Sequence, residues 1–141
     1  MNRGTRVAAL ALVAALTAGA GASGRSAEAS NTSVAKVGVR LVEFKLIPSI
    51  RRVPAGQVTF IVRNAGKLTH DLVVLKTTKP AGKLPTKGIQ AVEKGRVGKL
   101  PSLAPGTTKK LTLKLGAGHY ALICNIPGHY KAGQFADLTV R

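Results

Sequence analysis

Several residue types are scarce in this chain of 141 residues, and each scarcity limits what the protein can do. Cys124 is the only cysteine, Met1 is the only methionine, and tryptophan is absent. A single cysteine cannot form a disulfide bond within the chain, so its thiol is left for a bond to another chain, for reaction or for a metal. Because Met1 is the initiator, no thioether side chain is available to a site in the folded protein.

Acidic residues are also few. Asp and Glu total 5 against 22 Lys and Arg, which gives a formal net charge of +17. Beyond residue 29 the acids are Glu43, Asp71, Glu93 and Asp137, and they show no pairing typical of general acid–base catalysis. The sequence therefore predicts a protein that is not an enzyme and has no small-molecule substrate.

The positive charge is spread along the chain and does not form one block. Such a field favours acidic partners and speeds encounter with them. We expect an acidic protein or an anionic membrane surface as the partner of a monomer; the alternative is a solvated basic surface with no specific partner. Aromatic residues make up 4% of the chain and no nucleic-acid-binding motif is recognised, so no nucleic acid partner is expected.

Long hydrophobic runs are missing too. A basic start is followed by an uncharged run of Ala, Leu and Val over 7–16 and by small residues with Ala-x-Ala sites, the last at 27–29. The run is shorter than the roughly 20 residues that span a bilayer. Residues 1–29 are therefore predicted to be a secretory signal peptide, with an uncleaved N-terminal anchor as the alternative. Export would place the protein in the periplasm, outside the cell or on the outer face of the cytoplasmic membrane.

Residues 30–33 read as a flexible lead-in, and 34–141 suit one domain with one core. The segments with strand-like patterns are 34–46, with a slip near Glu43 that predicts a bulge, and 50–53, 57–63, 71–75, 107–115, 119–124 and 135–140. Residues 77–107 hold four prolines and are expected to form a long excursion, with a short helix over 88–97. Many short strands and almost no helix predict an all-β sandwich.

The most informative segment is the loop after the strand 119–124. It carries Cys124, His129 and Gln134, with four residues between each and the next, and Pro127-Gly128 sets a tight turn inside it. These three side chains offer a thiolate, an imidazole nitrogen and an amide oxygen as possible metal ligands. With a second imidazole from upstream it would form a trigonal His₂Cys site with a weak axial ligand, the geometry of a blue-copper centre.

His70 is expected to supply that second imidazole, because it lies between two strong strands and so at one end of the sandwich. His119 competes for the role, but strand alternation points it away from Cys124, so we expect it to be exposed and not a ligand. The plainer alternatives remain open. Cys124 would then be an inert buried thiol, and Gln134 an exposed glutamine beside an empty axial position.

Three groups are expected to support the site. Asn64 and Asp71 lie near His70 in sequence and are predicted to brace its loop, and the backbone N–H of Asp71 is predicted to donate to the Cys124 sulfur. If Gln134 is the axial ligand, its hard oxygen donor should favour Cu(II) and lower the reduction potential relative to a methionine site.

Taken together, these segments resemble the cupredoxins, the small blue-copper proteins. The resemblance covers roughly 34–141 and rests on the stretch 54–60 leading to 64–66, on His70, and on the pattern from Tyr120 through Cys124 and His129 to Gln134. It implies a Greek-key β-sandwich of about seven to eight strands, one type 1 copper, outer-sphere electron transfer and an exposed edge at His129. Glutamine in place of methionine at position 134 is similar to the stellacyanin branch of the plant phytocyanins.

The predicted function is therefore that of an exported blue-copper protein that carries single electrons between redox partners, with an acidic redox protein as the expected partner. The alternative is an extracytoplasmic copper-binding protein for storage or delivery of the metal. The predicted metal ligands are His70, Cys124, His129 and Gln134.

Overall fold

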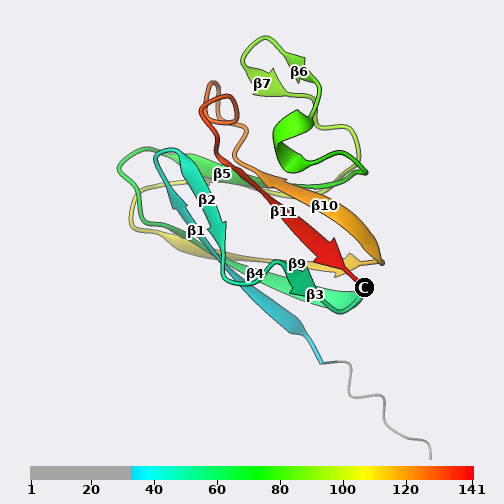
Figure 1. The fold of residues 1–141 in the computed structure, drawn as a ribbon. Helices are drawn as coiled ribbons and strands as arrows, with labels where there is room; N and C mark the ends of the chain where they lie inside the picture. Colours follow the sequence, from blue (N-terminus) through cyan, green and yellow to red (C-terminus); the bar gives the residue numbers. More distant parts are fainter. Residues whose placement is uncertain (1–32) are drawn as a thin grey trace, which may run out of the picture. The chain divides into compact units, whose positions relative to one another are not determined.

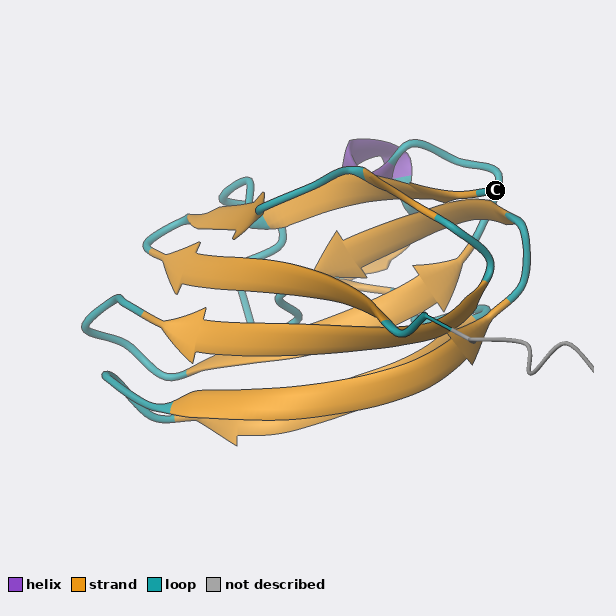
Figure 2. Cartoon of the chain, turned by 90° about the horizontal axis from the view of Figure 1, so that it is seen from below, coloured by secondary structure: helices purple, strands orange, loops and turns teal. Residues whose placement is uncertain are grey.

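The computed structural model describes residues 33–141, and they form an all-β sandwich (Figures 1 and 2). The predicted signal segment, 1–29, and residues 30–32 of the predicted lead-in lie outside the described residues. The elements are β1 Ala35–Val42, β2 Lys45–Pro48, β3 Arg52–Val53, β4 Gly56–Asn64, β5 His70–Lys76, the 3₁₀ turn η1 Ala81–Lys83, β6 Thr86–Lys87, β7 Gln90–Ala91, β8 Arg96–Leu103, β9 Thr108–Leu115, β10 Gly118–Ile123 and β11 Phe135–Val140. Within 33–141 no helix is long and apolar enough to cross a membrane.

Two sheets carry the fold. One has the strand order β2-β1-β4-β9 and the other β3-β11-β10-β5-β8, while β6 and β7 pair in a separate hairpin. The pairs β1–β4 and β3–β11 are parallel, and the other pairs are antiparallel. The chain passes from one sheet to the other after β2, β3, β4, β8 and β9, as in a Greek-key arrangement. The predicted β-sandwich is confirmed, although the described part has more strands than the seven to eight expected, because several are only two residues long.

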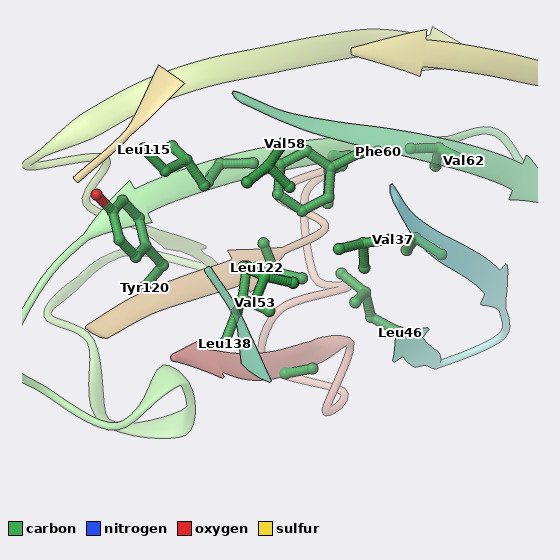
Figure 3. Close-up of a cluster of buried hydrophobic side chains, with 14 of the residues drawn as sticks. Val37, Leu46, Val53, Val58, Phe60, Val62, Leu115, Tyr120, Leu122 and Leu138 are labelled. Atoms are coloured by element: carbon green, nitrogen blue, oxygen red, sulfur yellow. The ribbon is translucent and has the colours of Figure 1, made fainter. Parts of the chain in front are cut away.

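The core lies between the two large sheets (Figure 3). Alternation along β4 buries Val58, Phe60 and Val62, each 0% exposed, against Leu122 of β10 and Leu138 of β11. Their neighbours in sequence face solvent or are half-buried, which is the period-two pattern that the sequence shows. Burial of this apolar surface is the main favourable term that holds the sheets together.

The predicted bulge near Glu43 is wrong, because the chain turns there. β1 ends at Val42, Glu43 and Phe44 form a two-residue turn, and β2 runs back beside β1 with Leu41 opposite Leu46. A slip in alternation fits a bulge and a tight hairpin equally well, and only the pairing distinguishes them.

The predicted helix over 88–97 is also wrong. This segment holds β7, a turn and the start of β8. Gly88 and Gly95 have φ of +61° and +81°, which a right-handed helix does not allow. Ala91 also uses its backbone N–H and C=O to bond the side chain of Asn125, so these groups are not available to a helix.

Removing a large aromatic side chain from the core should be costly. Phe60→Ala is expected to lower the free energy of unfolding by about 3–5 kcal/mol, because it removes a fully buried ring and leaves a cavity. Urea unfolding of the purified domain measures this. Val97→Ala, at a side chain that is 41% exposed, is the control and should change it by less than about 0.5 kcal/mol. Equal losses for the two variants would contradict the assignment of the core.

Candidate metal site

The predicted site residues meet at one end of the sandwich. β5 begins with His70, and β10 ends one residue before Cys124. These strands are antiparallel neighbours with Ile123 opposite Val73, so the start of one lies beside the end of the other. The loop from β10 to β11 then supplies the remaining predicted residues (Figure 1).

His70, Cys124 and His129 converge on a single point. Nδ1 of His70 lies 3.2 Å from Nδ1 of His129, and the Cys124 Sγ lies 3.8 and 3.5 Å from these two nitrogens. All three side chains are buried, and one ligand atom from each lies within 4.8 Å of the others. Two ring nitrogens and a sulfur that face one another in the protein interior are a donor set that a metal ion can hold together.

The loop between β10 and β11 is closed by its own hydrogen bonds. His129 N–H donates to Ile126 O (2.9 Å) and Gln134 N–H donates to His129 O (3.1 Å), while Cys124 N–H donates to Gln134 O (3.0 Å). Gly128 has a φ of +86°, so the tight turn needs a residue without a side chain there. These hydrogen bonds fold the loop so that the imidazole of His129 lies beside the sulfur of Cys124.

The sulfur of Cys124 sits in a dry and hydrogen-bonded setting. The predicted donor is confirmed, since the backbone N–H of Asp71 lies 3.4 Å from Sγ. Burial raises the pKa of the Cys124 thiol to about 12. A thiolate at neutral pH therefore needs a cation beside it, which a metal ion would provide.

His70 is held from two sides. Burial lowers its pKa, so the imidazole is neutral near pH 7, as a metal ligand requires. The predicted brace by Asn64 is present: its Nδ2 donates to Leu68 O and Leu103 O, both at 2.8 Å, and its Oδ1 accepts from Gly66 N–H at 2.9 Å. The loop that leads into His70 is thereby fixed.

Asp71 supports the other side of the site. Its Oδ1 accepts a hydrogen bond of 2.6 Å from Asn125 N–H, and its Oδ2 lies 3.6 Å from the Lys99 ammonium. The residue after His70 is thus tied to the residue after Cys124, which links the two strands that meet at the site.

Gln134 is fully buried, and its amide is half-satisfied. Nε2 donates to the carbonyls of Val42 at 3.0 Å and Lys45 at 3.4 Å, which fixes the orientation of the group. Oε1 is buried and has no hydrogen-bond partner among the described residues. Leaving a buried acceptor unpaired costs about 1–3 kcal/mol. An oxygen donor to a metal would recover that cost.

Sequence reasoning missed two residues of the β1–β2 turn. Glu43 Oε1 lies 3.2 Å from Nε2 of His70, and the Phe44 ring lies edge-on to the His129 ring with centroids 5.0 Å apart. The backbone N–H of Leu68 is the main reason that the pKa of Glu43 is lowered. The contact joins residues that are 27 positions apart in the sequence, and no local sequence pattern signals it.

The structure keeps His119 away from the site. Its Nε2 lies 2.8 Å from Asp137 Oδ1 and its Nδ1 lies 2.8 Å from Thr77 O. The side chain of His119 is 30% exposed, so it is half-buried and not exposed as the sequence predicts. The prediction that it lies outside the cluster is confirmed.

These residues fit copper better than other metals. Two imidazoles and one cysteine sulfur form the set that suits a blue-copper ion, and the unpaired Oε1 of Gln134 offers a weak oxygen donor. Structural zinc sites in proteins have four strong ligands from Cys, His, Asp or Glu, and no fourth such residue joins this cluster among the described residues.

The comparisons with known proteins agree with this chemistry. The model of the sulfocyanin (SoxE) domain matches residues 49–141, and no match was found among curated proteins. Solved structures with the same fold include auracyanin of Roseiflexus castenholzii, with a TM-score of 0.58 and 18% identity over 77% of this chain and 98% of that one. An azurin of Methylomonas sp. strain J gives 0.57 and 16% over 77% and 99%, and rusticyanin from Thiobacillus ferrooxidans gives 0.51 and 22% over 77% and 79%.

The matched model covers β3 to β11 and includes all the predicted site residues. The fold, the buried His₂Cys cluster and the domain match point to the same class of protein. The chain belongs to the sulfocyanin (SoxE) domain family and is a cupredoxin that carries copper.

Proposed function

We propose that the chain is an exported one-electron carrier in which His70, Cys124 and His129 bind one type 1 copper ion and Gln134 is the axial ligand. The observation that carries the proposal is the convergence of three buried donor atoms within 4.8 Å. Copper bound there would exchange single electrons with partners by cycling between Cu(I) and Cu(II).

The protein contributes rigidity and a dry environment. The donors come from β5 and from a loop closed by its own hydrogen bonds, so they are fixed before any metal arrives. Electron transfer is fast when ligand geometry changes little between oxidation states, and a site held in this way resists change. Burial of Cys124 and His70, both 0% exposed, also slows exchange of the metal with solvent, which favours a carrier over storage or delivery.

His129 offers the route for electrons. It is 8% exposed, whereas His70 and Cys124 are completely buried, so it is the site residue that reaches the surface. Three exposed apolar residues lie around the site, and we call them the apolar rim: Phe44, Leu68 and Ile89. The Phe44 ring contacts the His129 ring, Leu68 N–H bonds Glu43, and Ile89 O accepts from Gly128 N–H.

We infer that an acidic redox protein docks on the apolar rim. Lys67, next to Leu68, and Lys131, in the loop that carries His129, are both exposed. The net charge of the chain is strongly positive. Opposite charge speeds the encounter, and the apolar surface then allows close approach to His129. We propose that the carrier acts as a monomer outside the cytoplasm, on the basis of the signal-like segment 1–29.

Addition of Cu(II) to the purified domain tests the proposal. We expect an intense visible absorption from thiolate-to-Cu(II) charge transfer and a type 1 electron paramagnetic resonance spectrum, both reversible on reduction. Cys124→Ser should remove the absorption, while His119→Ala should keep it, because His119 lies outside the cluster. Colourless Cu(I) that passes readily to an apo acceptor would instead support the delivery role.

The axial ligand is tested by Gln134→Met. A thioether is softer than an amide oxygen, so we expect the reduction potential to rise and the visible absorption to remain. Protein-film voltammetry measures the potential. Gln57→Met, at an exposed position of β4, is the control for the substitution itself and should leave the potential unchanged. An unchanged potential in the Gln134 variant would rule out axial ligation.

Charge at the rim is tested with small redox reagents in place of the unknown partner. Lys67→Glu should slow oxidation by anionic ferricyanide severalfold at low salt, because it replaces a positive charge beside the apolar rim by a negative one. Lys114→Glu, near the end of β9 opposite Gln57, is the control and should have a weaker effect. Stopped-flow measurement of the oxidation rate across a series of salt concentrations tests this. Equal slowing in the Lys67 and Lys114 variants would refute steering by charge next to the site.

A further inference from the structure

The carboxylate of Glu43 lies on the side of His70 that faces away from the cluster. A single oxygen, Oε1, accepts from His70 Nε2 at 3.2 Å, from Lys67 N–H at 2.8 Å and from Leu68 N–H at 2.7 Å. Nδ1 of the same ring faces Cys124 and His129. The imidazole of His70 therefore contacts a carboxylate at Nε2 and the donor cluster at Nδ1.

The position of this carboxylate is built by two separate turns. Glu43 belongs to the β1–β2 turn, and the residues that bond it belong to the loop before β5. Gly66 leaves room for it, because a Cβ at that position would overlap both carboxylate oxygens. Asn64 fixes the loop by accepting from Gly66 N–H and donating to Leu68 O.

The geometry sets the tautomer of His70. A carboxylate oxygen can only accept a hydrogen bond, so Nε2 must carry the proton that it donates to Glu43. Nδ1 then presents its lone pair to the cluster, which is the form that binds a metal. A carboxylate partner also makes the imidazole a stronger donor and places a negative charge close to the site.

We propose that Glu43 is a positioning residue that holds His70 in the Nε2–H tautomer and, through its negative charge, makes the site favour Cu(II) over Cu(I). This rests on the proposed function, since it concerns the same site. The two effects separate cleanly by substitution. Glutamine can keep an oxygen at the place of Oε1, where three N–H donors face it, but it removes the charge; alanine removes both.

The first measurement uses the metal-free protein, so it does not depend on copper. ¹⁵N NMR of the histidine rings at a fixed neutral pH should show His70 in the Nε2–H form in the wild type and in Glu43→Gln. Glu43→Ala should give a mixture of tautomers. Gly66→Ala, which displaces the carboxylate and keeps the charge in the chain, should act in the same direction. A His70 tautomer unchanged in Glu43→Ala would overturn the positioning role.

The second measurement uses the copper-loaded protein. Mutation of a residue that hydrogen-bonds a metal-bound histidine lowers metal affinity by about 10–100-fold, and a substitution that keeps the hydrogen bond and removes only the charge belongs at the low end. We expect Glu43→Gln to weaken Cu(II) binding about tenfold relative to Cu(I), which raises a one-electron potential by about 59 mV. Asp137→Asn removes one negative charge at the His119 pair and is the control, with no comparable shift expected.

Each outcome bears on one proposal only. If the wild type takes up Cu(II) without the blue spectrum, the proposed function fails, while the tautomer result still tests Glu43. If the blue spectrum is present and Glu43→Gln shifts the potential no more than Asp137→Asn, the charge effect is refuted. Thermal unfolding of each metal-free variant shows whether the fold is retained, and Glu43→Gln provides the answer if Glu43→Ala does not fold.

Discussion

The antiparallel pairing of β5 with β10 is the constraint on which the site depends. The register that sets Ile123 opposite Val73 places the start of β5 beside the end of β10. The N–H of Asp71 then reaches the Cys124 sulfur, and the Asp71 carboxylate reaches Asn125 N–H. A shift of this register by one residue would turn each side chain to the other face of the sheet and break both bonds.

Negative charge is rare in this protein, and the fold concentrates it around the site. Of the four acids in the described part of the chain, three support the donor cluster or its neighbours. Glu43 bonds His70, Asp71 bonds Asn125, and Glu93 Oε1 accepts from the Asn125 side chain at 3.0 Å. Lys99 lies 3.1 Å from Glu93 and 3.6 Å from Asp71, so these two charges are partly balanced.

The excursion between β5 and β8 also serves the site. Its hairpin of β6 and β7 lies beside the loop from β10 to β11 (Figure 1). Asn125 joins the two, because its side chain bonds both the N–H (2.8 Å) and the C=O (3.0 Å) of Ala91, and Ile89 O accepts from Gly128 N–H. The residue after Cys124 is therefore held from two directions, which limits movement of the site.

The sequence by itself determined the fold class, the spacing of Cys124, His129 and Gln134, and the choice of His70 over His119, because strand alternation and loop chemistry are local properties. It did not reveal the β1–β2 turn, the strands within 77–107 or the contact of Glu43 with His70. Those depend on which distant segments pair, and a slip in alternation or a proline-rich stretch is compatible with several pairings. Only the tertiary structure decided that Glu43 lies against His70, 27 residues later in the sequence.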